Sequence, residues 1–335
     1  MLEALGIAAL VLAAISAAFL FALVGRRMSL AREERRRAEM ERRLKPLALA
    51  LTEDDQIDLP VLPAAELAVL ADVLGRYSRR VTGDARERIA GYFAGTEALA
   101  RELHALDDRR AWRRATAAYR LGDMACRDAG PPLVARLSDR DADVRASSAR
   151  SLGQLRFEDA ASPLVLVLVE ETVPRAIAFR ALLDIGGAAL PELRRLAGDE
   201  SADLRAAAVE LIGWLGDAAD AELLVAAMED SSAEVRARAA ASLGRLAETE
   251  GAAALTRALG DRIYFVRLHA ARALGQVGER DAVEQLLRQA REDRFEAARA
   301  AAEAVALIDP DALLAAAGLP DAGPHLHEAA DLLRV

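Results

Sequence analysis

The sequence predicts an all-α protein: a right-handed α-solenoid of about seven helical hairpins, preceded by a single transmembrane helix. Three observations support this. Alanine, the best helix former and a poor strand former, fills nearly a quarter of the chain. A short motif recurs about every 30 residues between positions 113 and 297. Residues 4–24 contain no charged side chain.

Composition excludes several classes of protein. Apolar residues make up 53% of the chain, too many for a disordered protein. Cys126 is the single cysteine, which rules out an internal disulfide or a CxxC site, and we expect it to be a structural thiol. The first 50 residues hold nine basic and five acidic side chains, which leaves a net charge of −13 on the rest of a chain that totals −9. So acidic a body argues against binding nucleic acid.

The first expected element is a transmembrane helix within residues 1–25. The uncharged run 4–24 would be about 32 Å long as a helix, which matches the hydrocarbon thickness of a bilayer. Arg26 and Arg27 follow it directly, so the positive-inside rule predicts a single-pass protein of the inner membrane, with its N-terminus outside and its solenoid in the cytoplasm.

Other interpretations of this run stay open. Ala14-Ile15-Ser16 offers a small-x-small site for signal-peptide cleavage, and the run is also compatible with a buried core helix. Ala13 and Ala17 have the small-xxx-small spacing that would let two such helices form a homodimer.

Residues 26–63 are expected to form a basic juxtamembrane helix and a linker. Pairs such as Glu33 and Arg37 are spaced i,i+4 in the favourable order, which predicts a helix over 28–45. Its role is a solvated spacer or a contact with anionic lipid headgroups. Pro46, Pro60 and Pro63 indicate the linker. Residues 64–105 then contain two helical stretches that we expect to be an N-terminal cap.

The repeats occupy residues 106–309. Each begins at an anchor followed eight and nine residues later by an apolar residue and, usually, a glycine, as in Val144 with Leu152 and Gly153. Apolar or small residues at offsets 0, 4, 5, 8 and 11 form one helical face, and a shorter amphipathic helix precedes each anchor. The anchors lie at positions 113, 144, 174, 204, 235, 266 and 297. Such hairpins bury their apolar faces only by stacking.

These units resemble the HEAT-repeat family, in particular the short bacterial units of phycobilin-lyase-like proteins. The resemblance depends on an aspartate six residues before the arginine of the unit. The resemblance implies that these residues form a buried polar ladder between successive units. The pairs are Asp139 and Arg145, Asp199 and Arg205, Asp230 and Arg236, and Asp261 and Arg267.

Two units depart from the pattern. Pro174 and Leu183 replace the anchor and the glycine of one unit, which predicts a change of curvature near residue 174. Ala298 and Ala306 replace the arginine and the glycine of the last, which predicts a terminal cap near residue 297. Residues 310–335, punctuated by prolines, are expected to form the C-terminal helical cap.

The sequence shows little catalytic chemistry, and we expect no enzyme, no cofactor and no metal site. No phosphate-binding glycine loop, HExxH or GxSxG motif occurs. Two of the four histidines, His325 and His327, would point about 200° apart on a helix, so they are poorly placed to share a metal.

A protein-binding surface is the remaining candidate site. The second helix of each unit should line the concave face of the solenoid, where arginines at outward positions suit an acidic segment of a partner; solvated surface is the alternative for each of them. Aromatic residues near the turns suit protein contacts or packing on the next unit. The candidates are Tyr119, Arg150, Arg180, Arg238, His269, Arg272, Trp112, Tyr264, Phe265 and Phe295.

The function that these features predict is a membrane-anchored cytoplasmic scaffold that binds a partner protein. The resemblance to membrane-anchored bacterial HEAT proteins implies a partner such as a membrane enzyme. A phycobilin-lyase-like or other HEAT-based enzyme is the alternative, and it would not need the membrane helix. A HEAT-type nucleic-acid-binding protein would need a basic groove, which the acidic body disfavours.

Overall fold

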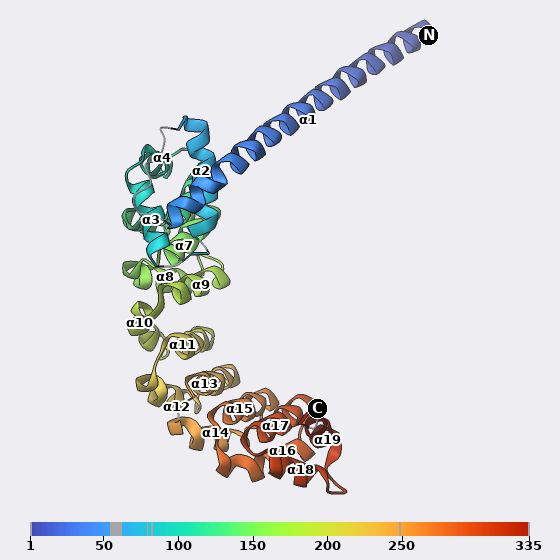
Figure 1. The fold of residues 1–335 in the computed structure, drawn as a ribbon. Coiled ribbons are helices and arrows are strands. Elements are labelled where there is room, and N and C mark those ends of the chain that lie inside the picture. The colour runs from blue at the N-terminus through green and yellow to red at the C-terminus, as the bar shows by residue number, and fades with distance from the viewer. Residues whose placement is uncertain (1, 54–61, 79, 82, 248, 334–335) are drawn as a thin grey trace. The chain divides into compact units, whose positions relative to one another are not determined.

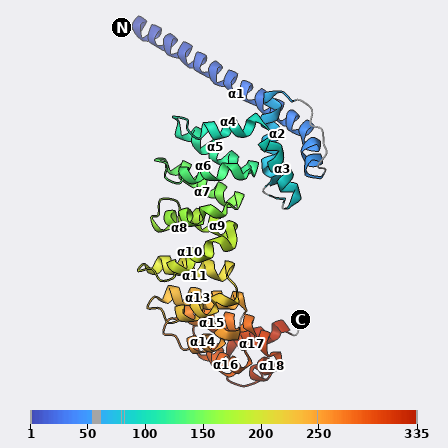
Figure 2. The same cartoon turned by 90° about the vertical axis from the view of Figure 1, so that its left-hand side faces the viewer.

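The computed structural model describes residues 2–53, 62–78, 80–81, 83–247 and 249–333. The side chains of residues 2–18, 22, 23 and 64 are not part of this description. Over the described residues every regular element is a helix. The chain forms two compact units (Figures 1 and 2): unit 1 comprises residues 1–109 and 116–129, and unit 2 comprises residues 110–115 and 130–335.

Unit 1 is built around the C-terminal part of a long first helix. Its helices are α1 (Leu2–Glu53), α2 (Ala64–Ser78), α3 (Asp84–Ala94), α4 (Glu97–Ala105) and the larger part of α5 (Ala111–Met124). The end of α1 packs against α2 and α3. Leu44, Ala48 and Leu51 are buried there, as are Leu70 and Phe93.

The predicted linker begins later than Pro46, because α1 continues through this proline to Glu53. Proline removes one backbone hydrogen bond from a helix, so its neighbours must stabilise the continuation. The buried face of α1 does this, together with ion pairs from Arg37 to Asp72 and from Arg43 to Glu66 of α2. These two bases of the predicted juxtamembrane helix therefore contact protein. The part of the linker at 54–61 lies outside the described residues.

The structure corrects the predicted localisation. Among the described residues, no helix has an apolar stretch long enough to cross a membrane. The predicted span 4–24 falls mainly on residues whose side chains lie outside the description, and from Arg26 onward α1 is rich in charge. The transmembrane helix and the single-pass placement in the inner membrane, N-terminus outside and solenoid cytoplasmic, are therefore withdrawn.

Unit 2 is a stack of helical hairpins, each made of a short helix and a longer one. The short helices are α6 (Gly130–Arg136), α8 (Ala161–Val169), α10 (Leu190–Leu196), α12 (Ala221–Ala227), α14 (Ala252–Ala258) and α16 (Val283–Glu292). The long helices are α7 (Ala142–Leu155), α9 (Arg175–Ile185), α11 (Ala202–Leu215), α13 (Ala233–Leu246), α15 (Tyr264–Val277) and α17 (Phe295–Ile308). At the end of the chain, α18 (Pro310–Ala317) and α19 (Gly323–Leu333) pack on α17.

Short and long helices form two separate layers of unit 2 (Figure 1), and the long helices lie on the hollow side of its bend. Each long helix packs on the next long helix as well as on its own short partner. The residue at offset 8 of every repeat is buried between them, for example Leu152 and Leu274. Offset 0 is buried in regular repeats, as at Val144 and Val266, whereas Pro174 is exposed. The 30-residue period of the sequence is therefore the period of the core.

Glycine allows the long helices to approach closely. A Cβ atom on Gly153 of α7 would lie 2.7 Å from the Cα atom of Ala181 in α9. Glycine occupies the same repeat position in α11, α13 and α15, but α9 has Leu183 there. Accordingly, α9 and α11 pack much less extensively than the other neighbouring long helices of unit 2.

Candidate functional site

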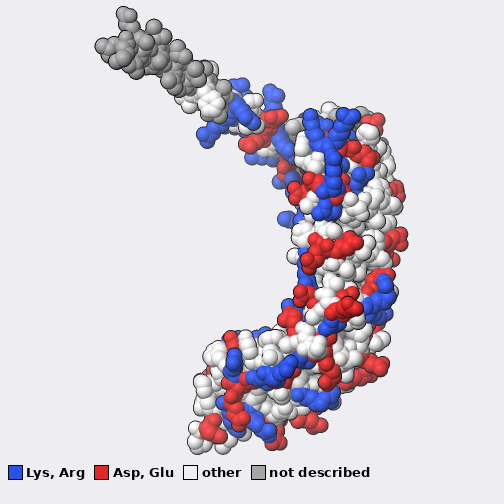
Figure 3. All heavy atoms as spheres, turned by 180° about the vertical axis from the view of Figure 1, so that it is seen from behind, with Lys and Arg blue, Asp and Glu red and all other residues white. Residues whose placement is uncertain are grey.

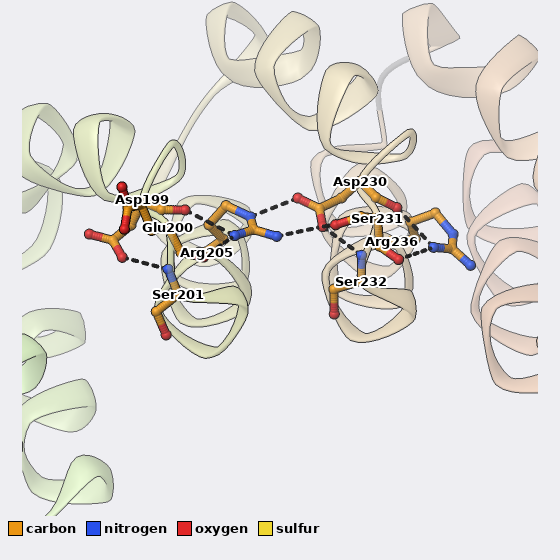
Figure 4. Close-up of polar contacts among 8 residues, drawn as sticks. All are labelled: Asp199, Glu200, Ser201, Arg205, Asp230, Ser231, Ser232 and Arg236. Atoms are coloured by element: carbon orange, nitrogen blue, oxygen red, sulfur yellow. Dashed lines mark hydrogen bonds and ion pairs between the residues drawn. The ribbon is translucent and has the colours of Figure 1, made fainter.

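The ladder arginines connect successive hairpins of unit 2. Arg205 of α11 donates from Nε and Nη2 to the two carboxylate oxygens of Asp230, each at 2.8 Å, and from Nη1 to the main-chain oxygen of Asp199 at 2.9 Å (Figure 4). Asp230 also accepts the main-chain N–H of Ser232 at 2.7 Å. Arg205 thus binds the backbone of its own unit and the carboxylate of the next.

This arrangement recurs but is not continuous. The same bidentate pairing links Arg236 to Asp261 and Arg267 to Asp293. Near the start of unit 2 it links Arg114 to Asp139. Between these runs, the ladder is interrupted.

The ladder is interrupted because the repeat that begins at Pro174 departs from the sequence pattern of the other repeats. Because Val169 stands where the other units have aspartate, Arg145 donates instead to the main-chain oxygens of Asp139 and Thr172. The carboxylate of Asp199 accepts the main-chain N–H of Ser201 rather than an arginine.

The ladder is a structural feature and not a reaction centre. The hydrogen bond from Arg205 outweighs burial and lowers the pKa of the Asp230 carboxyl. The corresponding bond from Arg114 lowers the pKa of Asp139. These carboxylates are charged and fully engaged near neutral pH, so they are poor candidates for proton transfer.

The exposed surface of the long helices, which we call the long-helix face, carries the other predicted polar residues. It consists of the residues at offsets 6 and 10 of the repeats, together with Arg238 and His269 at offset 3. The face presents Arg150 from α7, Arg180 from α9, Glu210 from α11, Arg238 from α13 and Arg272 from α15. Arg150 and Arg272 are exposed, and Arg180 pairs with Asp184 one turn later in α9 at 2.9 Å.

A tryptophan lies at the centre of this face. Trp214 of α11 is 58% exposed. The guanidinium carbon of Arg245, from α13, lies 4.7 Å from the centre of its ring, a cation–π geometry. Arg245 donates to the main-chain oxygen of Gly213 at 3.3 Å and to Ser242 Oγ at 2.6 Å.

The charged neighbours of this pair are arranged around Arg238. Arg238 donates to Glu234 and to Glu210, each at 2.8 Å, which joins α13 to α11. His269 of α15 is half-buried, and burial, followed by the positive charges of Arg272 and Arg238, lowers the pKa of its imidazole. His269 is therefore mainly neutral near pH 7.

The predicted aromatic residues lie elsewhere. Tyr264 and Phe265, half-buried at the start of α15, form an edge-to-face pair with ring centres 5.8 Å apart. Phe295 of α17 contacts His325 of α19, with ring centres 4.7 Å apart. Trp112 belongs to unit 2 and Tyr119 to unit 1; both side chains are exposed. The predicted aromatic and basic sets therefore do not form one site.

Trp214 and Arg245 were not predicted from the sequence. Both occupy offset 10, which lies one turn after offset 6 on the same side of the helix. The prediction followed offset 6, with Arg238 and His269 added from offset 3, and left out offset 10. Following both columns would have placed Trp214, Arg245 and Arg272 on one surface.

Other reactive side chains of the described residues have structural surroundings. Burial, reinforced by Asp128, raises the pKa of the Cys126 thiol to about 11. Its sulfur lies 3.3 Å from the main-chain oxygen of Ala90. His325 is buried, whereas Nδ1 of His327 contacts the main-chain oxygen of Gly323 at 2.6 Å. Within the described ranges, no group of three His, Cys, Asp or Glu residues is placed to hold a metal ion.

Comparison with protein-family models connects this architecture to a family. The model for HEAT repeats matches residues 99–183, 168–234 and 221–306, more than half of the chain. The chain belongs to the HEAT-repeat family. A comparison with curated protein sequences found no match.

Solved HEAT-like structures are similar in fold. Importin beta is 15% identical with a TM-score of 0.53, over 84% of this chain and 44% of its own. The Escherichia coli protein YibA is 18% identical with a TM-score of 0.43, over 83% and 99%. The CpcE–CpcF complex of phycocyanin lyase from Nostoc is 21% identical with a TM-score of 0.31, over 76% and 96%.

The expectation that the protein is not an enzyme is corrected by these findings. Folds of this kind host many unrelated functions, so a HEAT architecture is no argument against catalysis. The likeness is one of fold, and it assigns no reaction to this chain.

Proposed function

We propose that this HEAT protein is a scaffold that binds a partner protein through the long-helix face. The observation that carries the proposal is the exposure of Trp214 on a surface to which α7, α9, α13 and α15 contribute arginines. Tryptophan and arginine are the residues that most often dominate the energy of protein interfaces. A solenoid supports such a surface because its repeats present one continuous face.

The charge distribution favours protein over nucleic acid as the partner. The chain carries a net charge of −9. On the face of the molecule seen in Figure 3, basic and acidic side chains alternate over unit 2 without forming a basic stripe. Nucleic-acid binding depends mainly on contacts of many bases with phosphates, which such a surface does not offer.

Crosslinking tests the proposal. The full chain would be used as bait in extracts of its source cells, beside a variant with Arg150→Glu and Arg272→Glu on the long-helix face. A control variant, Arg288→Glu, changes an exposed arginine of α16 in the short-helix layer. We expect the face variant to lose the partner that the wild type and the control retain. Retention of every partner by the face variant would reject the proposal.

A further inference from the structure

The proposed function does not say which chemistry the long-helix face recognises. We infer that Trp214, Arg238, Arg245, His269 and Arg272, together the Trp214 cluster, bind an acidic side chain of a partner protein next to an apolar one. This inference rests on the proposed function and adds the partner's chemistry to it. It is carried by the polar contacts of Arg245, by the charges around it and by the exposed ring of Trp214.

Arg245 differs from the ladder arginines in its acceptors. The guanidinium groups of Arg205 and Arg236 each bind a carboxylate with two hydrogen bonds. Arg245 is also half-buried, but among the described residues its hydrogen-bond acceptors are a carbonyl and a hydroxyl oxygen. A partly buried charge is costly without a counter-ion, so a carboxylate of the partner protein would supply the counter-ion that Arg245 lacks.

The nearby carboxylates do not serve as the counter-ion of Arg245. Glu210 and Glu234 both accept hydrogen bonds from Arg238. Burial, with the positive charge of Arg238 acting in the same direction, lowers the pKa of Arg245 in spite of Glu210. The cluster thus contains three arginines and has two carboxylates beside it, and Arg238 already binds both of these carboxylates. With His269 neutral, the cluster keeps a surplus positive charge on a chain that is acidic as a whole.

Trp214 supplies the second half of the specificity. Arg245 lies against its ring, yet more than half of the side chain is exposed. A carboxylate bound by Arg245 would lie beside the exposed part of the indole, which suits an apolar neighbour in the same segment. Glu210 and Glu234 would repel the closely spaced phosphates of a nucleic acid, whereas a single carboxylate needs only the space beside Arg245.

The probe is a short synthetic peptide in which glutamate alternates with leucine. Two matched peptides carry glutamine for glutamate, or serine for leucine. The full chain with Trp112→Phe leaves Trp214 as its only tryptophan, so fluorescence reports on the cluster alone. We expect saturable quenching by the first peptide and at least about tenfold weaker binding of each matched peptide, because a charge-assisted hydrogen bond or a buried apolar side chain contributes a factor of that order.

Substitutions assign the binding to the cluster. We expect Arg245→Gln to weaken binding of the glutamate peptide about tenfold, whereas Arg288→Gln on α16 leaves it unchanged. Trp214→Ala, followed by fluorescence anisotropy of a labelled peptide, should weaken binding to a similar extent. Circular dichroism and urea midpoints equal to those of the wild type would show that the variants are folded.

Several results would overturn the inference. They are no binding of the glutamate peptide, equal binding of the glutamine peptide, wild-type affinity of Arg245→Gln, or quenching of Trp214 by a DNA oligonucleotide in place of the peptide. If the partner captured by the full chain is lost with Arg150→Glu and Arg272→Glu but retained by Arg245→Gln and Trp214→Ala, the inference fails while the proposed function stands. Retention by all of these variants rejects both.

Discussion

Each ladder arginine fixes two hairpins at once. Arg236 donates to the main-chain oxygen of Asp230 in its own unit and to both carboxylate oxygens of Asp261 in the next. Only a planar guanidinium can make these contacts together, because a lysine ammonium offers neither the fork nor the reach in two directions. Arginine therefore fixes both the spacing between successive repeats and the turn inside each repeat.

Removing one carboxylate of the ladder should destabilise unit 2. Asp230→Asn leaves the partly buried Arg205 without its counter-ion, and we expect the free energy of unfolding at pH 7 to fall by about 3 kcal/mol. The pKa of Asp230 is lower in the folded than in the unfolded protein, so its contribution is present at neutral pH and is lost as the pH falls below about 4.

Urea unfolding followed by circular dichroism, at neutral and acidic pH, measures this effect. The difference between wild type and variant should shrink in acid. Asp321→Asn, at an exposed aspartate of the turn before α19, is the control and should match the wild type throughout. A difference that does not change with pH would contradict the assignment.

Sequence reasoning reached the ladder residues more easily than it reached the Trp214 cluster. A six-residue spacing is visible in one chain, so the members of the aspartate–arginine pairs could be named. Their carboxylate partners lie some 25 residues downstream. Asp293 was not named, because Ala298 replaces the arginine of its unit. Arg245 and Trp214 lie on different helices, so no spacing within one helix predicts their contact; only alignment of the repeats places both at offset 10.

At the scale of the helix, glycine decides how closely the long helices pack. The methyl group of an alanine at Gly153 would meet main-chain atoms of Ala181, which cannot rotate away. The small residues at offset 4 have the complementary role, as Ala178 and Ala208 are fully buried. The glycines that recur in the sequence thus mark the positions where neighbouring long helices are in contact.

Gly153→Ala should therefore lower the free energy of unfolding, by about 1–3 kcal/mol, because α7 and α9 must separate to admit the methyl group. The matched control is Gly187→Ala, where the atom nearest to an added Cβ is Cδ1 of the flexible Leu190 side chain, at 3.9 Å. Urea unfolding of both variants beside the wild type measures the change. A wild-type midpoint for Gly153→Ala would show that the helices have room to adjust.

The end of α1 shows where prediction of elements failed. Pro46 and the acidic stretch after it resemble a linker when only local propensity is considered. Tertiary contacts override that preference, because the apolar face containing Leu44, Ala48 and Leu51 is buried in unit 1. The repeats were easier to predict, since seven aligned copies reinforce one another and a single segment has no such support.

A substitution in this segment checks that it is part of the folded unit. Leu44 is 3% exposed, and Leu44→Ala should cost about 2–5 kcal/mol through lost burial and the cavity left behind. Leu49, on the other side of α1, is 48% exposed, and Leu49→Ala should change little. Thermal unfolding of the two variants compares them directly, and equal melting temperatures would contradict a packed α1.

At the scale of unit 2, the junction between α9 and α11 is the weakest in the stack of long helices. Both features that tighten the other junctions are missing. Leu183 occupies the glycine position, and Arg175 donates to the main-chain oxygen of Asp203 instead of the carboxylate of Asp199. On the long-helix face, this junction separates Arg150 and Arg180 from the Trp214 cluster. A hinge there would let the two parts of the face adjust to a partner separately.

Distances between spin labels test this hinge. In a Cys126→Ser background, Arg150→Cys with Trp214→Cys places labels on α7 and α11, across the junction. Trp214→Cys with Arg272→Cys places them on α11 and α15, also two long helices apart but joined by close glycine contacts and ladder bonds. We expect a broader distance distribution for the first pair, because fewer interactions hold its helices in register. Equal widths would mean that the short-helix layer keeps the junction rigid, and the face would then bind as a single fixed surface.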